Sequence, residues 1–279
     1  MRNFSKIRKR GSSGFSLVEM LITVAILIII MAAVFQQINK TQKRYRAEES
    51  KLDMTQGTRE FMDQMVRDLR QAGYPNAKMY DGGNLATPIM NPATSDERNA
   101  VGLVSFTDKD IWFEGDVDGD GDVDSVRYTF LAGPGNTCPC QLRRAQVQKV
   151  NATPPTGQNI AASYTTALDG LINSSDANGA GSLPLAGTMY FKGGSVSTDV
   201  YFGNYKTVPV FRAFNAAGQE VFGPLAFTQA DYDASPKTGI YAIRTITINL
   251  NVMSNNNGSD LQTNMRPVSA MTASVRVVN

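Results

Sequence analysis

Residues 15–35 read FSLVEMLITVAILIIIMAAVF, an apolar run of 21 residues that only Ser16, Glu19 and Thr23 interrupt. A helix of this length rises about 31 Å, which is enough to cross the hydrocarbon core of a membrane. The first 14 residues contain five basic residues and no acidic residue. Because positive charge is retained on the cytoplasmic side, the sequence predicts a single-pass anchor with a cytoplasmic N-terminus and an exported remainder.

An ordinary secretory signal has a similar basic start, but it is cleaved after its apolar stretch, at small residues. Here the small residues 11–14 precede the apolar stretch, and residues 31–34 (MAAV) make a poor cleavage site. An uncleaved anchor fits better, but it does not explain Glu19, because a carboxylate in a membrane helix costs about 2.5–3.5 kcal/mol. We therefore expect Glu19 to have a function.

The sequence KRGSSG followed by FSLVEMLITVAIL, residues 9–27, resembles the leader and cleavage motif of type IV pilins and type II secretion pseudopilins. The resemblance implies that prepilin peptidase cleaves after Gly14, removes the leader 1–14 and N-methylates Phe15. It also implies that Glu19 pairs with the terminal amine of a neighbouring subunit. Such a pair would satisfy the carboxylate inside the membrane.

The polar residues 36–73 are predicted to continue the helix as an amphipathic segment to about Ala72, because no proline occurs before Pro75. Gly73 is a helix stop signal. Apolar side chains at spacings of three and four residues predict the face on which a globular head packs. These side chains are Leu52, Phe61, Met62, Met65, Val66, Leu69 and Ala72.

Residues 74–279 are predicted to form an exported β-rich head, because short β-branched and aromatic segments alternate with Gly, Pro and Asn. The segments are 101–106, 110–115, 123–130, 187–193, 198–205, 208–214, 219–227, 240–254 and 271–279. The two-residue period in 240–254 indicates an antiparallel sheet with one covered face. Residues 133–187 are predicted to form a loop-rich surface excursion, with a short helical piece around 163–172.

The sequence of residues 58–75, TREFMDQMVRDLRQAGYP, resembles minor pilins of the PilW kind and, more loosely, J-type pseudopilins of type II secretion. The expected fold is α+β and pilin-like, with a long, partly transmembrane N-terminal helix packed on an antiparallel sheet. The resemblance implies a minor type IV pilin that primes or caps the filament in low copy. A type II secretion pseudopilin and a pilus-tip adhesin that binds through 133–187 are the alternatives.

The same resemblance implies the partners and the location of the chain. The partners are prepilin peptidase, other major and minor pilins, the pilus assembly platform and the inner membrane. The chain is expected first in the inner membrane, with a periplasmic head, and then in a pilus at the cell surface.

The sequence EGDVDGDGDVDSVRY, residues 114–128, contains five aspartates at alternate positions. They are Asp116, Asp118, Asp120, Asp122 and Asp124. Counted from the first aspartate, they take positions one, three, five, seven and nine of an EF-hand-type loop, with Gly121 at position six. Calcium takes six to eight oxygen ligands, and so many adjacent carboxylates repel one another without a cation. The sequence predicts a structural calcium site here.

Position twelve of this loop departs from the EF-hand pattern, because Arg127 stands where a bidentate Glu is usual. Glu114 is our candidate for the missing ligand. The alternative interpretation of the loop is a polar hairpin turn, in which Asp-Gly pairs are favoured.

The composition excludes several classes of function. The chain has no histidine, which excludes the Ser-His-Asp triad and the HExxH zinc site, and we expect no enzyme. Without its first 14 residues the chain has 22 basic and 25 acidic residues, so charge gives no indication of nucleic-acid binding. Cys138 and Cys140 flank Pro139 and fit either a disulfide in an exported head or two free thiols.

Overall fold

A computed structural model gives the fold. It describes residues 14–80, 90–161, 163–176, 180–191, 194–254 and 266–277. Apart from Gly14, the predicted leader therefore lies outside the described residues. The chain divides into two compact units, Met1–Arg46 and Ala47–Asn279.

Helix α1, Leu17–Arg70, contributes residues to both units. Gly73 follows its end with a φ of 81°, a left-handed conformation that glycine adopts at little cost. The predicted packing face is confirmed near the C-terminal end of α1. Its buried residues are Thr58, Phe61, Met62, Met65, Asp68 and Leu69. Leu52 was wrongly included in this face, since it is 69% exposed and precedes the turns that the head covers.

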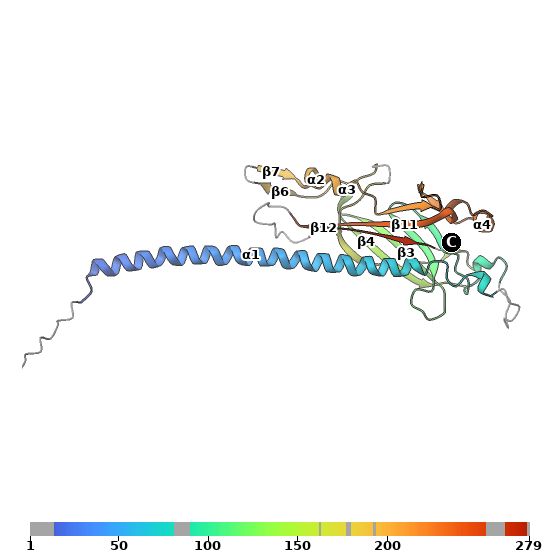
Figure 1. The fold of residues 1–279 in the computed structure, drawn as a ribbon, viewed down its shortest axis with the longest axis horizontal. Coiled ribbons are helices and arrows are strands. Elements are labelled where there is room, and N and C mark those ends of the chain that lie inside the picture. The colour runs from blue at the N-terminus through green and yellow to red at the C-terminus, as the bar shows by residue number, and fades with distance from the viewer. Residues whose placement is uncertain are drawn as a thin grey trace, which may run out of the picture. The chain divides into compact units, whose positions relative to one another are not determined.

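The head contains an antiparallel sheet, as predicted, in the order β10-β1-β2-β3-β4-β5-β11-β8-β9, with β12 added on β11 (Figure 1). Its strands are β1 (Leu103–Phe106), β2 (Asp110–Gly115), β3 (Asp124–Gly133), β4 (Thr137–Gln148), β5 (Thr165–Leu171), β8 (Phe211–Asn215), β9 (Glu220–Val221), β10 (Leu225–Ala226), β11 (Ile243–Met253) and β12 (Val268–Arg276). A separate hairpin consists of β6 (Thr188–Phe191) and β7 (Gly194–Ser197). The chain therefore has the predicted α+β fold.

Short helices lie between these elements along the chain. They are α2 (Thr198–Tyr201), α3 (Gly203–Lys206), α4 (Gln229–Asp233) and the 3₁₀ turns Ala77–Tyr80, Ala93–Ser95, Pro155–Gly157 and Gly239–Ala242. The prediction of a strand over 198–205 was wrong, because α2 and α3 occupy these residues. The hydroxyl of Ser197 accepts a hydrogen bond from the N–H of Asp199 and so caps the first turn.

The prediction of a loop-rich excursion over 133–187 was wrong for β4 and β5, which are both strands of the main sheet. The helical piece expected around 163–172 is strand β5, where Leu168 pairs with Leu142 of β4. Polar and charged residues alternate with the buried ones along β4, which gave this strand the composition of a loop. The alternation nevertheless follows the two-residue period of a half-buried strand.

Aromatic side chains join the end of α1 to the sheet. The rings of Phe61 and Tyr128 meet edge to face with centroids 5.8 Å apart, and Phe113 stacks on Tyr128 at 6.5 Å. All three side chains are buried. Burial of an apolar side chain of this size contributes about 1.5–3 kcal/mol, so the head packs tightly on this part of the helix.

Candidate functional site

The described part of the first unit exposes its large apolar side chains. Phe15 precedes α1 and is 74% exposed, and every large apolar residue from there to Phe35 is also exposed. Glu19 lies in the first turn of α1, where unpaired backbone N–H groups favour a carboxylate. Within the described part of the chain, α1 alone is long and apolar enough to cross a membrane. The segment is consistent with a membrane anchor.

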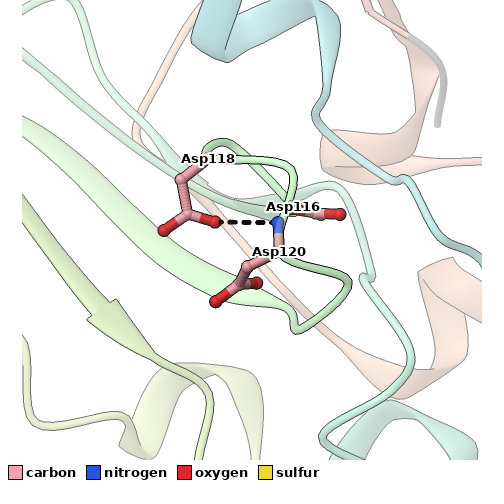
Figure 2. Close-up of side chains that lie close together, drawn as sticks. All are labelled: Asp116, Asp118 and Asp120. Carbon is pink, nitrogen blue, oxygen red and sulfur yellow. Dashed lines mark hydrogen bonds between the residues drawn. The ribbon is translucent and has the colours of Figure 1, made fainter.

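The aspartate loop, residues 116–124, joins β2 to β3 and brings three of the predicted ligands together. Asp116, Asp118 and Asp120 each place one carboxylate oxygen within 4.8 Å of the others. Figure 2 shows the three side chains on one turn, with the N–H of Asp120 donating to Asp118 Oδ1 at 3.3 Å. Oxygen ligands at this spacing are suited to a hard cation such as calcium.

The backbone of the loop is folded around Asp116. Its Oδ1 accepts a hydrogen bond from the N–H of Gly119 at 2.7 Å, and its Oδ2 accepts one from Gly121 at 3.2 Å. Both glycines have positive φ, 79° and 96°, which an L side chain adopts only with strain. The Asp-Gly pairs therefore serve the tight turn, whether or not a cation binds.

Asp122 and Asp124 do not belong to the cluster of three carboxylates. Gln148 Nε2 donates to Asp122 at 2.6 Å, and Gln146 Nε2 donates to Asp124 at 2.9 Å and to Asp118 at 3.3 Å. Burial, together with the negative charge of Asp118, raises the pKa of Asp124 to about 6. Two amide groups of β4 thus partly offset the repulsion among the loop carboxylates.

The prokaryotic N-terminal methylation motif matches residues 9–35 of the chain. The chain is a type IV pilin-like prepilin. The motif family is structural rather than catalytic. Among curated proteins and solved structures, none matches the chain significantly.

In the prepilin, Glu114 does not join the carboxylate cluster, contrary to our expectation. Its Oε2 accepts a hydrogen bond from Lys149 Nζ at 2.7 Å, and both side chains are completely buried. Lys149 Nζ also donates to the carbonyl oxygens of Thr94 and Asn99. Burial raises the pKa of Glu114, and the adjacent ammonium group opposes that shift. The pair is a buried structural contact at the base of the aspartate loop.

Arg127, at position twelve of the EF-hand count, faces strand β2. Its Nε donates to Asp110 at 2.9 Å, and its guanidinium group lies 5.3 Å from the centre of the Trp112 ring. The side chain is therefore held by cross-strand contacts and supplies no ligand. The described residues provide no bidentate glutamate in its place among the clustered carboxylates.

The aspartate loop is bonded directly to the chain that leaves α1. The N–H of Gly73 donates to the carbonyl oxygen of Glu114, and the N–H of Asp116 donates to the carbonyl oxygen of Tyr74, both at 2.9 Å. Gly115 lies between these bonds, and a Cβ there would clash with the backbone of Gln71. The loop therefore begins where the sheet meets the end of the helix.

A second connection runs through buried polar side chains that the sequence analysis missed. Asp68 of α1 accepts hydrogen bonds from Tyr128 Oη at 2.5 Å and from Arg144 Nε at 2.8 Å. Arg144 Nη2 donates to Gln146 Oε1 at 2.9 Å, which turns the amide nitrogen of Gln146 toward Asp118. Asp68 could have been found, because it falls on the helical face that Met65 and Leu69 define.

Cys138 and Cys140 form a disulfide within β4, and both residues are buried. Of the two alternatives that the sequence left open, the structure has the disulfide. Such a bond is expected in an oxidising, extracytoplasmic compartment.

Proposed function

We propose that this prepilin is a minor type IV pilin of the PilW kind, which prepilin peptidase cleaves between Gly14 and Phe15. After cleavage it stays in the inner membrane through 15–35, with its head in the periplasm, and then joins a filament in low copy. Its role is to prime or cap the filament as a structural subunit rather than to catalyse a reaction. The methylation motif over 9–35 is the main support for this proposal.

The surface of the first unit supports assembly with other subunits. Among the described residues, none covers the side chains of 15–35, so we expect lipid to surround them before assembly and other proteins afterwards. Glu19 is the only charged residue in this stretch. A charge in a membrane helix is stable when it has a partner, and the terminal amine of a neighbouring Phe15 would supply one.

A type II secretion pseudopilin has the same N-terminal segment and remains the alternative within this class. A tip adhesin is a second alternative, in which loops within 133–187 bind a surface. The size of the head favours few copies near a tip over many copies along a shaft.

We also propose that the aspartate loop binds calcium as a structural ion. Asp116, Asp118 and Asp120 would supply side-chain oxygens, and Asp122 a backbone carbonyl at position seven. The three carboxylates lie close together, and a bound ion would offset their mutual repulsion. Because the loop is bonded to the residues that follow α1, calcium would stiffen the contact between the helix end and the sheet.

A deletion strain distinguishes the pilus from the secretion machine. Loss of surface filaments, with secretion of type II substrates intact, is the expected result. Restoration of filaments by a tagged chain that also appears in sheared filament fractions would complete the test. Loss of secretion with normal filaments would instead identify a pseudopilin, and normal filament number with lost adhesion would identify an adhesin.

A further inference from the structure

Strand β12 has an outer edge that no strand covers among the described residues. Nine consecutive pairs join it to β11, from Thr245–Arg276 to Met253–Val268, and it pairs with no other strand. An unpaired strand edge presents a row of backbone N–H and C=O groups to its surroundings. In Figure 1, β12 lies next to β11 in the head.

Two hydrogen bonds at the ends of the hairpin show which backbone groups face outward. The N–H of Val277 donates to the carbonyl of Arg244, and the carbonyl of Pro267 accepts from the N–H of Ser254, both at 3.0 Å. Backbone groups of successive residues in a strand point to opposite sides, so odd-numbered residues of β12 face β11. The outward-facing residues are Val268, Ala270, Thr272, Ser274 and Arg276.

The side chains along this edge offer little hindrance to a second strand. From Val268 to Val275 the strand has no charged residue and no proline. Thr272 donates to Asn249 on β11, and Ser274 bonds to Thr247, so these hydroxyl groups are directed along the sheet. Natural sheets usually protect a long edge with lysine, proline, a bulge or a covering segment. Strand β12 contains neither lysine nor proline.

The strands at the two ends of the main sheet are much shorter than β12. They are β9, Glu220–Val221, and β10, Leu225–Ala226, each only two residues long. Gly223 and Pro224 lie between them, and proline cannot donate a backbone hydrogen bond. Short, interrupted edges of this kind do not support strand addition, whereas nine residues of β12 do.

We propose that β12 is an interaction surface that accepts an extended strand from another pilin-like subunit. This rests on the proposed function, because assembly with other subunits supplies the partner. The added strand would exchange backbone hydrogen bonds with the five outward-facing residues of β12. Small, uncharged side chains of the partner would fit opposite Ala270, Thr272 and Ser274.

A second copy of this chain fits the edge less well. Two β12 strands that pair antiparallel are related by a two-fold axis, which reverses the strand direction in the second copy. In Figure 1, β12 and residues 47–70 of α1 run in similar directions within the head, so the axis would also reverse this part of the helix. Two chains anchored in one membrane leave it on the same side.

The test replaces Thr272 by proline in the full-length chain, expressed in its own host. T272P removes one outward N–H and the hydroxyl bond to Asn249 but leaves the backbone hydrogen bonds to β11 intact, so the head should fold, while incorporation into filaments should be lost. T272A is the matched control, because it removes the hydroxyl bond to Asn249 but keeps the N–H, and it should be incorporated normally. A270P should behave like T272P, whereas A273P should lower the unfolding temperature, because its N–H faces β11.

Normal incorporation of T272P and A270P would overturn the proposal. The partner is identified by a photo-crosslinking amino acid, benzoylphenylalanine, placed at Ser274 in intact membranes and filaments. The expected product joins Ser274 to an extended segment of another pilin-like subunit, whereas a product with a second copy or with no pilin would contradict it. Absence of the wild-type chain from filaments would overturn the proposed function instead, and crosslinking in membranes would still decide the role of the edge.

Discussion

Residues 17–35 and 58–70 of α1 both present large apolar side chains, yet only the second set is covered by other residues that the structure describes. Met65 and Leu69 are completely buried against the sheet, whereas Leu27 and Ile28 are more than half exposed. The first set therefore depends on lipid or on other subunits, and the second contributes to the stability of the head. Substitutions in the two segments should have different consequences.

The largest loss of stability is expected inside the head, from Lys149→Met. Removing one partner of a buried ion pair leaves the carboxylate of Glu114 without its counter-charge, which costs about 3–5 kcal/mol of unfolding free energy. Denaturant unfolding of the full-length chain in detergent measures it through Trp112, the single tryptophan, which is buried in β2. Recovery of most of this loss in the double variant E114M/K149M would show that the unpaired charge was the cause. If K149M matches the wild type, the buried pair does not contribute.

Leu69→Ala and Leu27→Ala make a matched comparison between the two parts of α1. Leu69→Ala should cost about 2–5 kcal/mol, because it removes buried methyl groups and leaves a cavity. Leu27→Ala should leave the unfolding of the head unchanged, because its side chain is exposed. The same Trp112 signal measures both variants. Equal costs would contradict the division of the helix into a covered and an uncovered part.

Calcium should stabilise the head by a smaller amount. A ligand that binds only the folded state adds about 2.7 kcal/mol at 100 times its dissociation constant, so the melting temperature should rise with calcium and fall with chelator. Magnesium should have less effect, because it requires octahedral geometry and keeps its water. The double variant D116A/D120A should lose the calcium response. In protein first freed of metal, a melting curve that neither calcium nor chelator changes would leave the loop as a turn.

The smallest effect on head stability is expected from Glu19→Val in the exposed segment. The variant should insert in the membrane at least as well as the wild type, because it removes a costly charge, and its leader should still be cleaved. Incorporation into filaments should fall, because the terminal amine of the neighbouring subunit loses its partner. The amount of the variant in filament fractions, relative to its amount in membrane fractions, measures this incorporation. Normal incorporation would exclude the pairing of Glu19 with that amine.

Features set by local sequence were predictable, and features set by long-range pairing were not. The apolar run, the helix end near Gly73 and strand 110–115 follow from residue type and spacing alone. Strand β4 was missed, because Gln141, Arg143 and Gln146 resemble a loop until a neighbouring strand covers the other face. Sequence analysis found the aspartates but not their amide partners, since Gln146 and Gln148 come from that strand.

The proposed function depends on cleavage of the chain after Gly14 by prepilin peptidase. Intact-mass analysis of the protein from filament or membrane fractions tests it most directly, together with sequencing of its N-terminal peptide. We expect the mature chain to lack the 14-residue leader and to begin with N-methylated Phe15. A mature N-terminus beyond Ala33 would identify an ordinary secretory signal and contradict cleavage after Gly14.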